Sequence, residues 1–191
     1  TMAKGIVSGL TKIQKEFDFA YSHRVWNQEL RPELALDCNL GCTAQHGHNG
    51  KISVSLESEE LDHKGMVLDF KELGFFRKFV DDNLDHRCIL DINDPSIPTF
   101  YPLLKYLELG DNETLDNLLE YHEEGHFTIW SGHYQDLQKF EIEIYRGLVL
   151  VNFVPTSENL SKWLFDIVQA KLEGYAKVSH VEFYETPKSK S

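Results

Sequence analysis

Cysteine, positive charge and long apolar runs are all scarce in this chain of 191 residues. The three cysteines, Cys38, Cys42 and Cys88, are too few and odd in number to suggest a disulfide framework. No apolar run is long enough to cross a membrane, and the N-terminal residues lack a charged-then-apolar signal pattern. We therefore expect a protein of the reducing cytoplasm, without a membrane partner, in which thiols stay available for chemistry.

The deficit of positive charge excludes a second class of partner. Lys and Arg number 19 against 31 Asp and Glu, which gives a net charge of -12, and the only basic cluster is the short KSK near the C-terminus. Nucleic-acid binding requires cations that displace phosphate counterions, so we expect no nucleic-acid partner. A phosphorylated small molecule remains compatible with this balance if a few Lys or Arg line its pocket. Hydrophobic content of 41% is ordinary for one globular domain.

Alternation and helical spacing predict the main elements. Residues 13–20, 51–58 and 178–186 alternate polar and apolar side chains, as half-buried strands do. Asp69 is expected to cap a helix that ends near residue 83, and a second helix is expected over 157–174. The apolar stripe of the first helix is predicted to contain Phe70, Leu73, Phe76 and Val80.

Residues 91–147 are predicted to form an insertion within a single domain that covers 1–191. Within it we expect an acidic helix near 111–123 and strands at 127–130 and 140–145. Two strands, a helix, this insertion, a helix and a final strand predict an α+β fold with an antiparallel sheet.

The segment CTAQHGHNG, residues 42–50, concentrates groups that can do chemistry. His46 and His48 are two residues apart, so both side chains project to one side of an extended segment. His23, at the end of the neighbouring predicted strand, could complete a three-histidine site. Three neutral imidazoles with one open position are typical of catalytic zinc. The alternative is a solvent-exposed polar loop in a chain with nine histidines.

Three further positions each allow two interpretations. Cys42 is either a fourth ligand, which would close the zinc site, or a free thiol activated by a nearby cation. Asp85 can orient His86 across a turn, or the two can be a helix-terminal carboxylate and a surface histidine. Glu185 follows apolar residues on its face of the last strand. It lies either at the exposed end of that strand or where it anchors a ligand.

A competing metal motif is HEEGH at residues 122–126, which matches the H-E-x-x-H helix of zinc peptidases. Its His122, Glu123 and His126 would be the functional groups. We disfavour this hypothesis, because Glu124 places a charge between the histidines and Gly125 weakens the required helix. The alternative is a solvated helix end.

Six segments, in order, resemble the 6-pyruvoyl-tetrahydropterin synthase / 6-carboxytetrahydropterin synthase family. They are FDFAYSHR at 17–24, CTAQHGHN at 42–49, GMVLDF at 65–70, LDHR at 84–87, PTSENL at 155–160 and Glu185–Thr186. The chain departs from the family at Gly50, where a bulky residue is usual, and in the length of its insertion. The resemblance implies the tunnelling fold (T-fold), with two helices on one face of the sheet. It also implies trimer-based homo-oligomers, stacked as hexamers, with sites between subunits.

The resemblance also implies a role for each candidate residue. The implied zinc ligands are His23, His46 and His48. The implied proton-transfer groups are Cys42, Asp85 and His86. The implied contacts to the pterin substrate are Glu185, Thr156 and Ser157.

The spacing from Cys42 to His-Gly-His resembles that of the 6-carboxytetrahydropterin synthases. The resemblance therefore implies a Zn²⁺-dependent lyase that converts 7,8-dihydroneopterin triphosphate to 6-carboxy-5,6,7,8-tetrahydropterin, with loss of acetaldehyde and triphosphate, in 7-deazapurine and queuosine biosynthesis. The alternatives are a 6-pyruvoyl-tetrahydropterin synthase, which only eliminates triphosphate, and a non-catalytic pterin-binding paralogue.

Overall fold

The long strands of the protein form one continuous antiparallel unit. The structure, a computed structural model, describes residues 9–37, 39–105 and 118–191. Strand β1 (Thr11–His23) pairs along its whole length with β2 (His46–Ser58), and β2 pairs with β7 (Lys177–Thr186). All three predicted strands are confirmed, and each is longer than the alternating segment that predicted it.

The complete sheet is mixed. Beyond β1, the strands β3 (Arg87–Asp91) and β6 (Leu148–Val151) add in parallel, followed by the short β5 (Phe127–Ile129) and β4 (Leu119–Tyr121). On the other side, β8 (Ser189–Lys190) pairs with the end of β7. The order is β4-β5-β6-β3-β1-β2-β7-β8. The antiparallel prediction therefore holds for the long strands, and the insertion supplies the outer strands of the β3 side.

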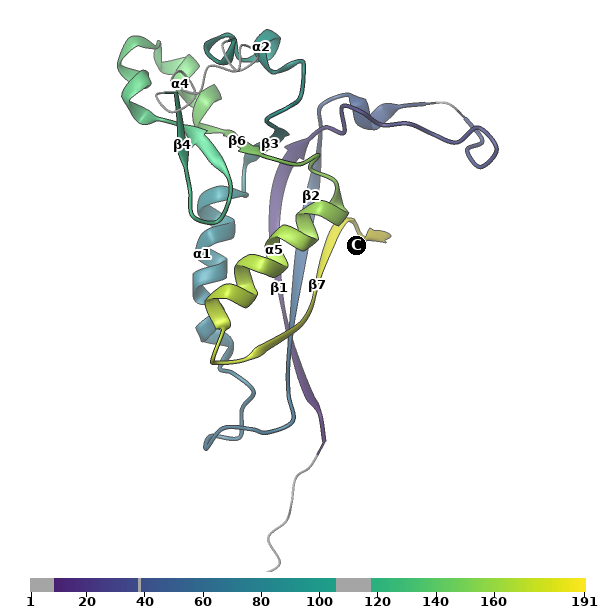
Figure 1. The fold of residues 1–191 in the computed structure, drawn as a ribbon, viewed down its shortest axis with the longest axis vertical. Coiled ribbons are helices and arrows are strands. Elements are labelled where there is room, and N and C mark those ends of the chain that lie inside the picture. Colours follow the sequence, from purple (N-terminus) through teal and green to yellow (C-terminus); the bar gives the residue numbers. More distant parts are fainter. Residues whose placement is uncertain (1–8, 38, 106–117) are drawn as a thin grey trace, which may run out of the picture.

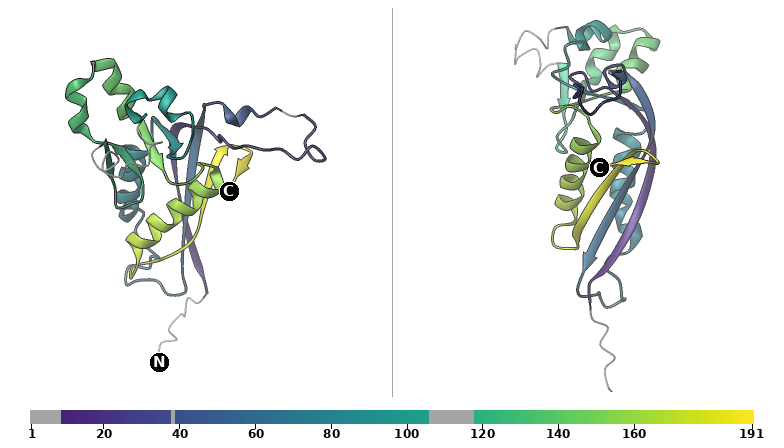
Figure 2. Two further views of the ribbon diagram at one scale, coloured as in Figure 1. Left: turned by 45° about the horizontal axis from the view of Figure 1, so that its top comes forward. Right: turned by 90° about the vertical axis from the view of Figure 1, so that its right-hand side faces the viewer.

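Two helices cover one face of the long strands (Figures 1 and 2). A 3-10 turn (Phe70–Leu73) leads into α1 (Gly74–Asn83), and the Asp69 side chain accepts a hydrogen bond from the Lys71 amide, as predicted for a cap. Helix α5 (Ser157–Leu172) begins at Thr156, whose hydroxyl accepts from the Asn159 amide. Within the described residues, no helix is long and apolar enough to cross a bilayer.

The main core lies between these helices and the sheet. Phe17 of β1 meets Phe76 of α1 edge-to-face at 5.0 Å between ring centroids, and Trp163 of α5 meets Phe79 at 5.8 Å. The predicted stripe of the first helix is confirmed for three of its members. Phe70 is the exception: it is about half exposed, because it begins the 3-10 turn and not the α-helix.

The insertion builds a second, smaller core against β3 and β6. It contains α2 (Ile97–Phe100), a 3-10 turn (Pro102–Leu104), β4, β5, a 3-10 helix (Ser131–Asp136) and α4 (Lys139–Arg146). The buried residues of this second core are Leu90, Ile97, Tyr101, Leu104, Leu118, Leu119, Ile129, Tyr145, Leu148 and Leu150.

Two predictions inside the insertion need correction. Residues 140–145 were expected as a strand, but they form α4, because Gln138 and Glu141 make a capping box and Tyr145 turns into the second core. Of the helix expected near 111–123, residues 111–117 lie outside the described residues, and 119–121 form β4. The strand expected at 127–130 is confirmed as β5.

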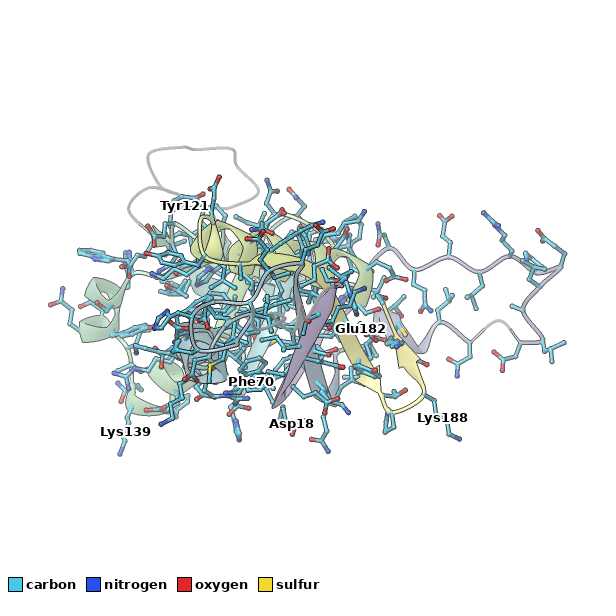
Figure 3. All side chains as sticks on the ribbon, turned by 90° about the horizontal axis from the view of Figure 1, so that it is seen from below. Asp18, Phe70, Tyr121, Lys139, Glu182 and Lys188 are labelled. Atoms are coloured by element: carbon cyan, nitrogen blue, oxygen red, sulfur yellow. The ribbon has the colours of Figure 1, made fainter. Side chains whose placement is uncertain are left out.

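Residues 24–37 and 39–45, between β1 and β2, form an arm that extends away from the body (Figures 1 and 3). A 3-10 turn (Gly41–Thr43) near its base carries Cys42. The arm therefore connects two strands whose adjoining ends hold histidines.

Candidate metal centre

The pairing of β1 with β2 brings the three candidate histidines together. His23 ends β1 and lies opposite His46, while His48 lies opposite Tyr21. The Nε2 atom of His23 is 3.1 Å from that of His46 and 3.2 Å from that of His48. One ligand atom from each ring lies within 4.8 Å of the others, which makes this a group that could hold a metal ion.

Backbone carbonyls fix the orientation of two of these rings. His23 Nδ1 donates to the Pro155 carbonyl at 2.6 Å, and His46 Nδ1 donates to the Ala44 carbonyl at 2.8 Å. With a proton held on Nδ1, each Nε2 presents a lone pair to the centre of the cluster.

Burial disfavours the charged form of two of these rings. It lowers the pKa of His23 to about 4, with a further contribution from His46 and His48, although the Pro155 carbonyl opposes the shift. Burial also lowers the pKa of His48, again with help from His46. Three imidazoles with converging Nε2 atoms are a donor set that fits Zn²⁺.

Cys42 lies at the base of the arm and outside the histidine cluster. Its carbonyl accepts from the Val25 amide at 2.8 Å, and its amide donates to Gln28 Oε1 at 3.1 Å. Among the described residues, the group of close ligand atoms contains no cysteine. The arrangement favours the interpretation of Cys42 as a free thiol over that of a fourth ligand.

Asp85 and His86 form the pair that was one of two alternatives from the sequence. His86 has a left-handed backbone (φ 59°), and its Nδ1 lies 3.1 Å from Asp85 Oδ1. The same carboxylate oxygen accepts from the Ala20 amide, which lowers the pKa of Asp85, and His86 adds to this shift. The His86 side chain is 79% exposed. Within the described residues, no hydrogen bond or ring contact joins this pair to the three histidines.

Glu185, near the end of β7, lies beside the cluster. Its Oε1 atom is 3.7 Å from His23 Nε2, and burial together with Glu158 raises its pKa, while His46 opposes the shift. Thr156 and Ser157 follow Pro155 at the start of α5; Thr156 caps the helix, and the Ser157 hydroxyl meets that of Ser191 at 2.7 Å. The Pro155 contact therefore ties the α5 N-terminus to the histidines.

The competing HEEGH motif does not form a helix. Residues 122–126 make the turn between β4 and β5, where Gly125 has φ +100° and the His122 amide donates to the His126 carbonyl. The two rings stack at 4.4 Å between centroids, but their Nε2 atoms bond to Thr128 and Asn83 respectively. The zinc-peptidase alternative is therefore wrong, because its geometry requires a helix and this segment is a tight hairpin.

Two contributors to the site were not predicted from the sequence. The Pro155 carbonyl is a backbone group, which no side-chain pattern could indicate. Tyr21 lies under the cluster, with its ring centroid 5.2 Å from that of His23. Its position in an alternating strand predicts only that it is buried.

Comparison with known proteins agrees with this geometry. A family model described as 6-pyruvoyl tetrahydropterin synthase matches residues 12–191. A protein from Aquifex aeolicus named 6-carboxy-5,6,7,8-tetrahydropterin synthase is 28% identical over 190 residues, covering 94% of this chain and 95% of its own length. A protein of the same name from Rickettsia typhi is 26% identical over 113 residues, covering 57% of this chain and 75% of its own.

Solved structures show the same fold. An uncharacterized protein from Wolinella succinogenes superposes with a TM-score of 0.87 at 43% identity, covering 96% of this chain and 97% of its own. The 6-pyruvoyl tetrahydropterin synthase of Plasmodium vivax gives a TM-score of 0.53 at 17% identity, covering 96% of each chain, and shows the shared T-fold alone. With the family model matching nearly the whole chain, this protein is an enzyme of the 6-pyruvoyl tetrahydropterin synthase family.

Proposed function

We propose that this protein is a Zn²⁺-dependent 6-carboxy-5,6,7,8-tetrahydropterin synthase. The observation that carries the proposal is the convergence of three imidazoles beside a half-buried carboxylate, Glu185. The similarity to the Aquifex aeolicus synthase over nearly the whole of both chains supports the choice of reaction. The substrate would be 7,8-dihydroneopterin triphosphate, and with water it would give 6-carboxytetrahydropterin, acetaldehyde and triphosphate.

In this proposal Glu185 anchors the pterin ring. The pterin edge presents two adjacent N–H donors, from the 2-amino group and ring N3, and a carboxylate can accept both. Glu185 is half-buried and close to the cluster, so a bound ring would place its side chain near the histidines. Thr156 and Ser157, at the start of α5, would contact the same ligand.

The metal would be held by His23, His46 and His48. Bound there, Zn²⁺ supplies Lewis-acid polarisation of the substrate side-chain oxygens. Cys42 would remove a proton from the side chain as a thiolate, and His86, oriented by Asp85, would transfer the second proton. The hydrogen bond from the Ala20 amide keeps Asp85 ionised, which suits that orienting role.

The exposure of His86 supports a site shared between copies of the chain. The three histidines and Glu185 belong to one cluster, but Asp85 and His86 make no contact with it among the described residues. We propose that the proton-transfer pair of one copy faces the cluster of another, in a trimer-based homo-oligomer of hexameric size. Such an assembly brings together all nine candidate residues.

Two alternatives from the same family remain. A 6-pyruvoyl-tetrahydropterin synthase would eliminate triphosphate and retain all side-chain carbons, and a paralogue without activity would bind pterin only. We favour the carboxy product, because the relatives from Aquifex aeolicus and Rickettsia typhi bear the name of that synthase. Its product would serve 7-deazapurine and queuosine biosynthesis in the cytoplasm.

One experiment separates these outcomes. Zinc-loaded protein is incubated with 7,8-dihydroneopterin triphosphate, and the products are identified by mass spectrometry while acetaldehyde is trapped. We expect 6-carboxytetrahydropterin with one acetaldehyde per triphosphate released. A pyruvoyl product without acetaldehyde would select the first alternative, and unchanged substrate would select the second. The matched control is His46→Ala protein.

A further inference from the structure

Tyr21 reaches from β1 across the sheet to β7. Its ring lies 5.6 Å from those of both His48 on β2 and Phe183 on β7, measured between centroids. It lies on the same face of the sheet as His23, two residues further along β1. The Tyr21 ring therefore packs directly against two of the three clustered histidines, His23 and His48.

Gly50 makes this crossing possible. A Cβ atom at residue 50 would lie 2.9 Å from Cε1 of Tyr21 and 3.0 Å from the ring of Phe19, closer than real contacts allow. The ring of Tyr21 thus occupies the space that a side chain at residue 50 would fill. Lys51 pairs with Tyr184, and the same register continued by one residue places Gly50 opposite Glu185. The ring of Tyr21 therefore lies over Gly50, in the row of the sheet to which Glu185 belongs on β7.

The hydroxyl of Tyr21 is buried and lacks a hydrogen-bond partner among the described residues. Only 4% of the residue is exposed. A buried hydroxyl without a partner is unfavourable, and a phenylalanine would fill the same space without that cost. A phenol hydroxyl can donate one hydrogen bond, and Glu185 lies close enough to act on this hydroxyl electrostatically.

We propose that Tyr21 is a positioning residue for Glu185: its hydroxyl donates a hydrogen bond to the Glu185 carboxylate when that carboxylate turns to accept the edge of a pterin ring. The inference rests on the proposed function, in which Glu185 anchors the pterin. A carboxylate that accepts a hydrogen bond from Tyr21 presents its remaining lone pairs in a fixed direction. It therefore favours ligands with two adjacent N–H donors. Tyr21 would thereby set selectivity for the 2-amino-4-oxo ring edge.

The test compares two probes that differ only at this edge. Pterin carries the 2-amino group and no side chain, while lumazine has a carbonyl in its place. Affinities for both are measured by calorimetry on zinc-loaded protein for the wild type, Tyr21→Phe, Glu185→Gln and the double variant. We expect Tyr21→Phe to weaken pterin binding about tenfold, with a smaller effect on lumazine and unchanged zinc content.

Coupling and stability distinguish positioning from packing. In the Glu185→Gln background, Tyr21→Phe should have no further effect on pterin affinity, because the residue acts through the carboxylate. The melting temperature of Tyr21→Phe should equal or exceed that of the wild type. The matched control is Phe19→Leu, which removes the ring stacked on Tyr21 at 5.1 Å; it should lower the melting temperature but keep the pterin-to-lumazine ratio.

Each contrary result has a separate meaning. Unchanged pterin affinity in Tyr21→Phe, or an equal loss in both backgrounds, would overturn the positioning role while leaving the Glu185 anchor in place. A lower melting temperature in Tyr21→Phe would assign the hydroxyl to structure and also overturn it. If Glu185→Gln itself leaves pterin affinity unchanged, the anchor of the proposed function fails, and this inference fails with it.

Discussion

His23 is constrained at both of its ring nitrogens. Its Nδ1 is fixed by the Pro155 carbonyl and its Nε2 faces the other two imidazoles, while 1% of the residue is exposed. His46 is likewise held at Nδ1, by the Ala44 carbonyl, and His48 turns its Nε2 toward that of His23. At the scale of residues, the candidate site is a set of converging donors, two of which have their directions fixed by backbone carbonyls.

Replacing one imidazole should therefore remove the metal. We expect His46→Ala to lose zinc and turnover together, because two imidazoles cannot complete a catalytic zinc site. His122→Ala is the control, since its ring belongs to the β4–β5 hairpin and bonds to Thr128. The measurements are metal content by mass spectrometry and product formation. Loss of zinc in His122→Ala would contradict the site assignment.

Cys42 should behave in the opposite way. Because it lies outside the group of converging nitrogens, Cys42→Ala should keep zinc and pterin affinity while turnover falls by about 100-fold or more, the usual contribution of a proton-transfer group. Cys88→Ala is a matched control: that thiol accepts a hydrogen bond from Gln45, and burial raises its pKa. If Cys42→Ala protein lost its zinc, the thiol would be a ligand.

At the scale of elements, a buried ion pair fixes the insertion to the end of β1. Arg24 directly follows His23, and its Nε lies 2.9 Å from Oδ2 of Asp94; the two atoms attract as charges, although their angle is not that of a hydrogen bond. The Asp94 side chain is fully buried, and its other oxygen accepts from the amide and hydroxyl of Ser96. His23, a candidate metal ligand, is thus linked to the insertion through Arg24.

Asp94→Asn should destabilise the protein by about 3–5 kcal/mol, because it leaves the largely buried guanidinium of Arg24 without its charge partner. Chemical denaturation measures the loss. The control is Asp81→Asn, whose partner Arg77 forms an exposed i,i+4 pair on α1, and there we expect a change below about 0.5 kcal/mol. Equal effects in the two variants would contradict a buried, stabilising pair.

The β4–β5 hairpin should make stability depend on pH. His126 packs against Phe79 and Trp163, and burial, with a contribution from His122, lowers its pKa from 6.5 to about 4. Between pH 6.5 and about 4, His126 is therefore protonated in the unfolded chain but neutral in the folded chain. The stabilising contribution is complete above about pH 6.5 and is lost as pH falls toward 4, by roughly 3 kcal/mol.

The groups that face His126 are His122, stacked on it, and the uncharged Asn83, Phe79 and Trp163. His126→Gln removes the titration but retains a hydrogen-bonding group for Asn83. Denaturation between pH 7 and 4 should show a steeper fall for the wild type than for this variant; the shift at His23 is common to both and cancels. Parallel curves would contradict the prediction.

The elements differ in how far the sequence alone could define them. Alternation predicted the strands at 13–20 and 51–58, and the two-residue spacing predicted that His46 and His48 project to one side of the backbone. Only the structure shows that both belong to β2 and lie opposite the end of β1. The same rule failed at 140–145, where a six-residue alternation suits either a strand or an amphipathic helix. In this segment the capping box at Gln138 and the burial of Tyr145 favour the helix over the strand. The mixed sheet could not be predicted either, since the parallel pairing of β3 with β1 joins residues that are 66 apart in sequence.

The site shows the same limit. The sequence left two interpretations of Asp85 and His86 open, because the two residues are adjacent. In the structure His86 has a positive φ, and its imidazole lies against the Asp85 carboxylate. The hydrogen bond from His23 to the Pro155 carbonyl and the position of Tyr21 over Gly50 arise from tertiary packing, which a linear pattern does not contain. The extent of the single domain over 1–191 stays a prediction.

At the scale of the whole molecule, two long strand edges remain open. β1 pairs with β3 only at Tyr21–His23, and β8 covers β7 only near Tyr184–Thr186. Among the described residues, no strand covers the outer edges of 11–19 or 177–182. These edges lie on opposite sides of the β1–β2–β7 unit, so pairing them head-to-tail between copies would close a ring.

We therefore expect an oligomer, most compatible with trimers stacked as hexamers. Light scattering coupled to size exclusion at micromolar concentration should give several times the 22.1 kDa of one chain. Introducing Pro at Ser179 in the uncovered edge of β7 should reduce the assembly, because proline blocks one backbone donor. A monomer in the wild type would contradict both the ring and the shared site.

The contact between His23 and Pro155 also sets an order of events during synthesis. The candidate ligands at 23, 46 and 48 are synthesised before the residues of α5 and β7. The carbonyl that fixes the proton on His23 follows 132 residues later, and Glu185 comes later still. A nascent chain can therefore present three histidines well before it can orient them. The oriented set of imidazoles forms only after α5 has docked.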